Sequence, residues 1–140
     1  DIKQALEEYT PQNNRSQILS KNGYDIVLDA YNANPTSMKA ALENFVLMAA
    51  DRKALILGDM FELGNTAAAE HQTIADMVEK FQFDQAYLVG ENFNATDTSL
   101  ATFPSFDDLK KHLQRNPLEK GAVLIKGSRG MALERVLDIL

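Results

Sequence analysis

The sequence predicts an α/β domain built on a doubly wound, mostly parallel, Rossmann-like sheet, with one antiparallel edge strand and helices on both faces. Two observations carry this prediction. Short apolar runs of strand length alternate with longer stretches in which apolar residues recur every three or four positions. The first two apolar runs are instead separated by an Asn-Gly pair, which is typical of a tight hairpin.

The chain is expected to open with a short helix over residues 1–14, followed by that hairpin. Strand candidates cover residues 15–20 and 24–30, and the Asn22-Gly23 pair between them tolerates the positive φ angles of a two-residue turn. The hairpin therefore supplies the antiparallel pair at one edge of the sheet. The chain begins without a methionine and in the middle of a helical pattern, so we expect a piece of a longer protein.

After the hairpin, helices and strands alternate, which predicts parallel strands joined by right-handed crossovers. Runs such as "KALILG" and "AVLIKG" show almost no polar alternation, as expected for strands covered on both faces. The polar residues 90–99 are expected to form an irregular loop. The predicted helices cover residues 36–50, 67–81, 106–113 and 131–140, and the predicted strands cover residues 53–58, 85–90 and 122–127.

The composition is that of one soluble globular domain, with 45% hydrophobic and 24% charged residues in a chain of 140. The net charge of −6 argues against nucleic acid as the main partner, although a few well-placed cations would suffice for ATP. No cysteine is present, so neither a disulfide nor a thiolate metal site can form, which fits a protein of the reducing cytoplasm. No run of about 18 apolar residues and no signal-peptide pattern occurs, so no membrane partner is expected.

Several well-known catalytic motifs are absent from the sequence. There is no GxxxxGK[ST] loop for nucleotide phosphates, no GxGxxG fingerprint and no GxSxG nucleophile turn. Without cysteines, or a pair of histidines at metal-ligand spacing, no metal site is expected either. The residues therefore indicate a binding or contributing domain rather than a complete enzyme.

Polar clusters follow three of the predicted strands: "DAYNANP" at 29–35, "GDMFELG" at 58–64 and "KGSRG" at 126–130. In doubly wound sheets, ligands bind outside the carboxyl ends of the strands. We therefore expect these clusters to line one rim of the sheet and to form a ligand site there.

In the first cluster, Asn34 before Pro35 is expected to cap the following helix, since Asn is a favoured cap and Pro a favoured first helical residue. A cap does not require the other polar residues of the cluster. Asp29 could accept hydrogen bonds from ribose hydroxyls, and Tyr31 and Asn32 could contact a base or a phosphate.

The other clusters each allow two interpretations. In "KGSRG", Lys126 and Arg129 beside glycines and a predicted helix N-terminus indicate an anion site, and a plain strand-to-helix turn is the alternative. Asp59 and Glu62 are either turn residues or site residues. His71 is in register with the apolar face of its predicted helix, which favours a buried packing histidine over a catalytic one.

These motifs in this order, with the histidine downstream of the second, resemble the C-terminal domain of the Mur ligases over residues 15–140. They are most similar to the branch that adds D-Ala-D-Ala to UDP-MurNAc-tripeptide during peptidoglycan synthesis in the cytoplasm. The resemblance implies that ATP and Mg²⁺ are used. ATP phosphorylates the tripeptide carboxylate, and the amine of D-Ala-D-Ala attacks the resulting acyl phosphate.

The resemblance also implies a three-domain chain. Residues 1–14 would be the tail of the central ATPase domain, and residues 15–140 would be the third domain. The N-terminal and central domains of the same chain would then be its partners, and the central domain would hold the phosphate loop and the Mg²⁺ ligands. The third domain alone is therefore expected to contain no catalytic residue and to be inactive.

The resemblance places individual positions of this sequence in three groups. ATP contacts are implied for Arg15, Asp29, Tyr31, Asn32 and Asn34. Contacts with the incoming dipeptide are implied for Lys126, Gly127, Ser128 and Arg129. A match to the signature of the branch, with roles left open, is implied for Asp59, Glu62 and His71.

Two other classes of protein fit part of the pattern. A receiver-type phosphoacceptor domain also uses acids at strand ends and a lysine after its last strand, as Asp29, Asp59 and Lys126 could be. It also needs an adjacent pair of acids, whereas Ala30 follows Asp29 here. A dinucleotide-binding oxidoreductase domain would require the glycine fingerprint that is missing.

Overall fold

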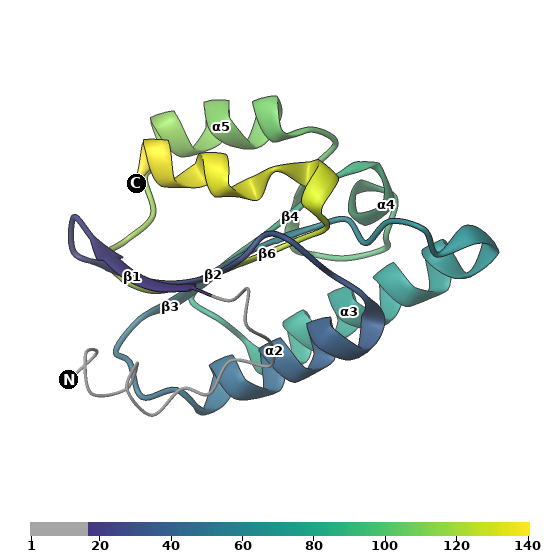
Figure 1. Ribbon diagram of the computed structural model, residues 1–140, viewed down its shortest axis with the longest axis horizontal. Helices are drawn as coiled ribbons and strands as arrows, with labels where there is room; N and C mark the ends of the chain where they lie inside the picture. Colours follow the sequence, from purple (N-terminus) through teal and green to yellow (C-terminus); the bar gives the residue numbers. More distant parts are fainter. Residues whose placement is uncertain (1–16) are drawn as a thin grey trace.

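The computed structural model describes residues 17–140, which form a six-stranded sheet between two helical layers (Figure 1). The strand order is β1-β2-β6-β3-β4-β5, with β1 antiparallel to β2 and every other neighbouring pair parallel. This confirms the predicted fold class. The strands are β1 (Gln17–Lys21), β2 (Tyr24–Asp29), β3 (Lys53–Gly58), β4 (Gln85–Val89), β5 (Ala101–Phe103) and β6 (Gly121–Lys126).

Two of the predictions cannot be compared with this structure. The helix predicted for residues 1–14 and the proposed ATP contact Arg15 lie outside the described residues.

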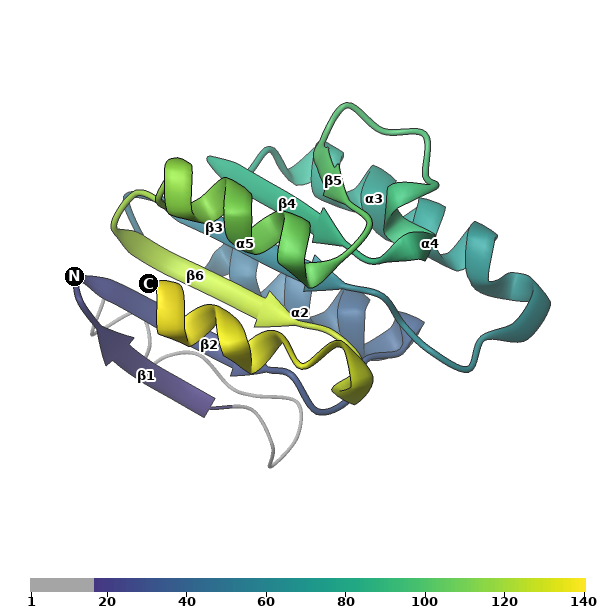
Figure 2. The ribbon, with the colours of Figure 1, turned by 90° about the horizontal axis from the view of Figure 1, so that it is seen from above.

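The hairpin turns at Asn22 and Gly23, whose φ angles are 52° and 88°. Both angles lie in the left-handed region, which Asn and Gly tolerate better than other residues. Lys21 pairs directly with Tyr24 across the turn. The hairpin prediction is therefore confirmed, and β1 is an edge strand that runs against the direction of the others (Figure 2).

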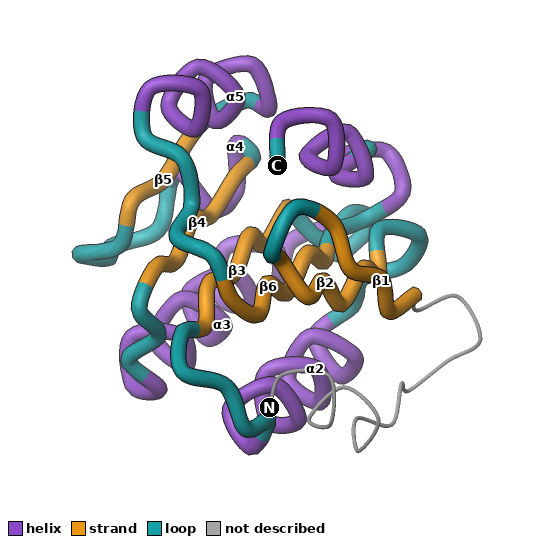
Figure 3. Tube along the Cα trace, turned by 90° about the vertical axis from the view of Figure 1, so that its left-hand side faces the viewer, coloured by secondary structure: helices purple, strands orange, loops and turns teal. Residues whose placement is uncertain are grey.

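Three of the predicted helices are present and cover both faces of the sheet (Figure 3). The helices α2 (Pro35–Leu47) and α3 (Ala67–Phe81) lie on one face, and α5 (Phe106–Arg115) lies on the other beside the C-terminal segment. Their buried residues recur at helical spacing, as the periodicity of the sequence predicts. None of the helices within residues 17–140 has the length and apolar character needed to cross a membrane.

Each face of the sheet buries its own hydrophobic core. Alternate residues of β6 enter opposite cores: Leu124 packs on the side of α2 and α3, whereas Val123 and Ile125 pack on the side of α5. All residues of β6 are buried, as expected for a central strand covered on both faces. The carboxyl ends of the central strands are therefore firmly held by the packing beneath them.

Two predicted segments are wrong. The stretch 90–99 contains the helix α4 (Glu91–Asn94) and is followed by β5, whose three residues are too few to show an alternating pattern. The helix predicted for residues 131–140 consists of 3₁₀ segments, Arg129–Met131 and Leu133–Ile139. Ala132 between them has a φ angle of 50°, which interrupts the helical hydrogen bonding.

Candidate functional site

The carboxyl ends of β2, β6 and β3 lie side by side at one edge of the sheet, because the three strands are parallel and adjacent (Figure 2). Asp29 of β2 pairs in register with Lys126 of β6. The three polar clusters therefore meet in space as the sequence predicts. We call this edge the rim, and it consists of residues 29–34, 59–63 and 126–130.

A buried ion pair joins the first and third clusters of the rim. Lys126 Nζ donates to Asp29 Oδ2 at 2.7 Å and to the carbonyl oxygen of Asn32 at 3.0 Å. Asp29 is 5% exposed and Lys126 is 1% exposed, so each charge is stabilised by the other rather than by bulk water. In this structure the ammonium group predicted to contact substrate holds the loop that leaves β2.

Exposed side chains of the rim surround a cavity of about 250 Å³, which we call the first cavity. Tyr31, Asn32 and Arg129 are exposed there and offer an aromatic ring, an amide and a guanidinium group. Residues predicted to contact ATP and residues predicted to contact the dipeptide thus face one space. The lining consists of Tyr31, Asn32, Ala33, Phe61, Glu62, Ser128, Arg129 and Gly130.

Asn34 has the structural role that its position predicts. Its Oδ1 accepts a hydrogen bond from the backbone N–H of Ser37 at 2.9 Å, and Ser37 Oγ accepts from the backbone N–H of Asn34 at 3.1 Å. This reciprocal capping box starts α2, with Pro35 as the first helical residue.

The loop after β6 differs from the anion site that its sequence indicates. The segment that follows is a three-residue 3₁₀ turn, Arg129–Met131, so no long helix points its positive end at the loop. A Cβ atom at Gly127 would lie 2.9 Å from Leu133 Cδ1 and 3.1 Å from Gly58 Cα. Close packing therefore accounts for the glycine, and Arg129 supplies the exposed positive charge of the loop.

Ser128 links the loop after β6 to the loop after β3. Its backbone N–H donates to the Asp59 carbonyl oxygen at 3.1 Å, and its Oγ accepts from the backbone N–H of Phe61 at 2.9 Å. Ser128 is also buried. The hydroxyl that was predicted to contact the dipeptide thus bridges two segments of the rim.

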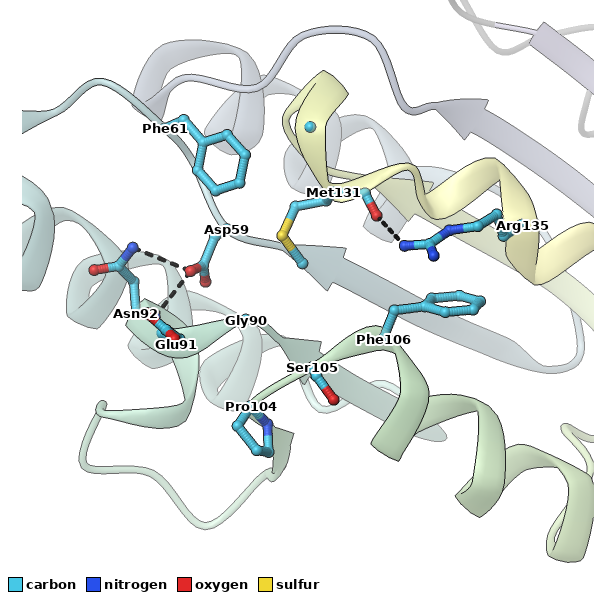
Figure 4. Close-up of a pocket in the computed structure, with 11 residues that line it drawn as sticks. Asp59, Phe61, Gly90, Glu91, Asn92, Pro104, Ser105, Phe106, Met131 and Arg135 are labelled. Carbon is cyan, nitrogen blue, oxygen red and sulfur yellow. Dashed lines mark hydrogen bonds between the residues drawn. The ribbon is translucent and has the colours of Figure 1, made fainter.

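The Asp59 carboxylate caps α4, which answers one of the roles that the sequence left open. Oδ2 accepts from the backbone N–H and the side-chain amide of Asn92, at 2.8 and 3.0 Å (Figure 4). Oδ1 accepts from the backbone N–H of Phe93 at 3.0 Å. A Cβ atom at Gly90 would lie 2.3 Å from Asp59 Cγ, so this approach requires a glycine there.

His71 is fully buried in α3, with its ring edge-on to that of Phe93 at a centroid distance of 4.7 Å. Nε2 accepts from the backbone N–H of Met60 at 3.0 Å, and Nδ1 donates to the carbonyl oxygen of Ala67 at 2.6 Å. A ring nitrogen that accepts carries no proton, so this imidazole is neutral. The packing role is confirmed, together with a hydrogen bond that no sequence spacing indicates.

Glu62 is the remaining signature residue. It is exposed, lines the first cavity and has a φ angle of 65° in the left-handed region. No contact within the described residues explains why a glutamate is present at this turn.

A second cavity, of about 310 Å³, shares Phe61 and Gly130 with the first and was not predicted (Figure 4). The Arg135 guanidinium lies over the Phe106 ring at 4.0 Å and donates to the Met131 carbonyl oxygen at 2.9 Å. Segments distant in the sequence form this cavity, so no single motif could indicate it. The lining consists of Asp59, Phe61, Gly90, Glu91, Asn92, Pro104, Ser105, Phe106, Gly130, Met131 and Arg135.

The positions of the acidic side chains also decide whether the rim fits a metal site or the site of a receiver-type phosphoacceptor domain. Among residues 17–140, no three His, Asp or Glu side chains lie close enough together to hold a metal ion. A phosphoacceptor carboxylate has to face solvent, whereas Asp29 is buried against Lys126 and Asp59 is buried against α4. The strand-end acids therefore do not form a receiver site.

A doubly wound sheet whose polar strand-end loops surround open cavities is the arrangement in which Rossmann-like domains bind their ligands. Residues 14–129 match the family model described as Mur ligase, glutamate ligase domain. The chain therefore belongs to the Mur ligase family, in agreement with the resemblance of its motifs.

Curated relatives cover nearly all of this chain. The UDP-N-acetylmuramoyl-tripeptide–D-alanyl-D-alanine ligase of Borreliella burgdorferi is 34% identical over 148 aligned residues, which cover 99% of this chain and 32% of the relative. The ligase of the same name from Bacillus subtilis is 32% identical, over 88% of this chain and 29% of its own length. The chain thus spans about a third of the length of these relatives.

Solved structures give the same family. The MurF ligase of Thermotoga maritima in complex with ADP superimposes with a TM-score of 0.74 at 26% identity, covering 89% of this chain and 30% of the neighbour. A MurF structure from Acinetobacter baumannii superimposes with a TM-score of 0.71 at 26% identity, covering 95% of this chain and 31% of the neighbour.

Proposed function

We propose that this chain is the C-terminal domain of an ATP-dependent ligase that joins D-Ala-D-Ala to UDP-MurNAc-tripeptide in cytoplasmic peptidoglycan synthesis. The family match and the names of the relatives support this reading. The observation that carries it is the first cavity, where exposed Tyr31, Asn32 and Arg129 from two strand-end loops face one space. Such a rim suits contact with ligands that are bound mainly by another domain.

In the proposed reaction, the tripeptide carboxylate attacks the terminal phosphorus of ATP and releases ADP. The amine of D-Ala-D-Ala then attacks the acyl phosphate, so that an amide forms and phosphate leaves. This domain supplies no catalytic residue in either step. Its part is to bring contacts to the ligands when the N-terminal and central domains of the same chain and this one close around them.

The contacts divide into nucleotide contacts from the β2 side and dipeptide contacts from the β6 side. Tyr31 and Asn32 are exposed and can reach a ligand directly. Asp29 and Lys126 are buried as a pair, so they act on the nucleotide and the dipeptide mainly by holding the β2 exit loop in place. Arg129 offers its guanidinium to a phosphate or a carboxylate, because a planar fork binds both anions well.

The Mg²⁺ of the proposed reaction would be held elsewhere in the full-length protein. Residues 17–140 contain no cluster of His, Asp or Glu that fits a metal ion. No metal-dependent step is therefore assigned to these residues, and the phosphate loop is likewise expected on the central domain.

The test compares Arg129→Ala with Arg115→Ala in the full-length ligase. Arg129 lines the first cavity, whereas Arg115 is an exposed arginine at the end of α5. Loss of one charge-assisted contact is expected to lower kcat/KM by about tenfold or more at an unchanged melting temperature. Arg115→Ala is expected to retain full activity, and equal activity of the two variants would contradict the site assignment.

The isolated 140-residue chain tests the proposal that the catalytic steps depend on the other domains of the full-length protein. It is expected to form no amide from UDP-MurNAc-tripeptide, D-Ala-D-Ala and ATP, and to bind ATP weakly or not at all. Product formation by the chain alone would refute the proposal that the chemistry belongs to the central domain.

A further inference from the structure

The exit of β3 is held by hydrogen bonds at three consecutive residues. The carbonyl oxygen of Asp59 accepts from the Ser128 N–H at 3.1 Å, and the N–H of Phe61 donates to Ser128 Oγ at 2.9 Å. Between them, the N–H of Met60 donates to His71 Nε2 at 3.0 Å. Side chains and backbone from two distant segments therefore fix this short stretch of chain.

These bonds fix the backbone that carries the side chain of Phe61. Its ring lines both cavities and is 43% exposed, although it lies at the rim of a well-packed domain. A Cβ atom at Gly130 would lie 2.6 Å from Phe61 Cε2, so the ring rests directly on the Gly130 backbone. An exposed aromatic ring on a fixed backbone, shared by two cavities, is suited to contact a ligand.

The surroundings of His71 require the neutral ring protonated at Nδ1. The Nδ1 proton is donated to Ala67, which leaves Nε2 free to accept. Asp59 Oδ1 lies 3.8 Å from Nε2, but the carboxylate oxygens already accept from Asn92 and Phe93. The Asp59 carboxylate therefore does not need a hydrogen bond from His71, because its oxygens already have donors in α4.

We propose that His71 is a positioning residue of the ligand site. Its neutral imidazole accepts the Met60 N–H and thereby holds Phe61 as the wall between the two cavities. The consequence for catalysis rests on the proposed ligase function, whereas the structural part can be measured without it. This gives a role to the histidine downstream of "GDMFELG", which the sequence left open.

The structural part is tested by ¹⁵N NMR of the His71 ring and by hydrogen exchange at the amides of Met60 and Phe61. We expect the signature of a neutral imidazole protonated at Nδ1, and slow exchange at both amides. A ring that is charged at neutral pH, or protonated at Nε2, cannot accept from Met60 and would overturn the proposal. This measurement needs no ligase activity.

The catalytic part is tested in the full-length ligase with His71→Leu and His71→Gln. The leucine fills the space but accepts no hydrogen bond, so KM for D-Ala-D-Ala is expected to rise on the order of tenfold, more than kcat falls. The glutamine can offer an amide oxygen to the same N–H and is expected to restore part of the loss. Identical KM values for both variants and the wild type would contradict a positioning role.

His112→Leu is the matched control. His112 is a half-buried histidine of α5 that packs against the rings of Tyr87 and Phe103, away from the rim. We expect it to lower stability without raising KM, and an equal rise in KM for the two leucine variants would refute the proposal. If the wild-type ligase does not use D-Ala-D-Ala, the proposed function fails, and the NMR result alone decides the role of His71.

Discussion

The exits of β2 and β3 lie at the same rim, and each begins with a buried aspartate, yet they are built in different ways. Asp29 pairs with a cation, Lys126, whereas Asp59 accepts from the uncharged N–H donors of α4. After Asp29 the chain exposes Tyr31 and Asn32. After Asp59 the backbone is bonded at each of the next two residues.

An aspartate at equivalent strand ends can therefore either anchor an outward-facing loop through an ion pair or cap a helix. The β2 exit is anchored at its base and presents polar side chains outward, which suits contact with something outside the domain. From Asp59 to Phe61 the β3 exit directs its hydrogen-bonding groups inward, which stiffens the rim, and Glu62 is its exposed polar side chain. Variants of these and neighbouring residues test this difference.

The largest effect is expected from Lys126→Met. This change removes the buried ammonium group that pairs with the Asp29 carboxylate, at an expected cost of about 3–5 kcal/mol in the free energy of unfolding. Urea denaturation measures this cost. Lys111→Met is the control, because its contact with Asp107 at 3.4 Å is exposed, and a similar loss in both variants would contradict the burial argument.

The same pair makes Asp29→Ala an unsuitable test of a ribose contact, because the fold itself is expected to weaken. The double variant Asp29→Leu/Lys126→Met is informative instead. Its loss of stability is expected to be smaller than the sum of the single losses, since neither charge remains buried alone.

The second effect concerns the other aspartate. Asp59→Ala is expected to lower the free energy of unfolding by about 2–3 kcal/mol. The backbone N–H groups of Asn92 and Phe93 would lose the carboxylate that accepts their hydrogen bonds. Asp59→Asn keeps one carbonyl oxygen and is expected to lose less. Hydrogen exchange at these amides reports the cap directly, and protection that survives in Asp59→Ala would show that α4 does not depend on it.

A smaller effect is expected from Asn34→Ala, which removes one half of the capping box of α2. The expected cost is about 1 kcal/mol, and Ser105→Ala at the start of α5 is the matched cap and is expected to cost the same. The ligase activities of the Asn34→Ala and Ser105→Ala variants are then measured in the full-length protein. A much lower kcat/KM for Asn34→Ala at equal stability would favour the nucleotide contact that the resemblance implies, and equal activity would leave Asn34 as a cap alone.

The smallest effect is a pH dependence at Glu79, a half-buried acid of α3 that provides a contrast to the two buried aspartates. The hydroxyl groups of Ser99 and Thr98 donate to its carboxylate at 2.7 and 3.0 Å and hold the pKa of Glu79 below its ordinary value of 4.5. Because the pKa is lower in the folded state, the stabilisation is present above the unfolded pKa and is lost as the pH falls through the folded pKa.

Glu79→Gln should therefore be slightly less stable than the wild type at neutral pH, and the difference should shrink in acid. Urea unfolding of both proteins, at pH 7 and at a pH below the folded-state pKa of Glu79, measures this difference in the free energy of unfolding. A difference that grows on acidification would contradict the assigned hydrogen bonds.

The parts of the site that could be predicted are those with local causes. The capping role of Asn34 follows from Pro35 beside it and from Ser37 three residues away, so the signal lies within one turn of helix. The three clusters meet at one rim because the strands before them are parallel, so that their carboxyl ends lie at the same edge of the sheet. In contrast, Asp29 and Lys126 lie 97 positions apart, and no spacing indicates that they pair.

The amino-acid sequence alone was enough to predict the order of the longer helices and strands and the loops that reach the rim, because local periodicity and chain direction decide both, but it did not indicate α4 or β5. It also carried the family resemblance in three short motifs. Which partner each polar residue binds depends on the folded arrangement: Lys126 pairs with the buried Asp29, Asp59 caps α4, and His71 accepts from Met60. These partners come from distant segments, and each contact forms because a buried polar group is stable only when it is hydrogen-bonded.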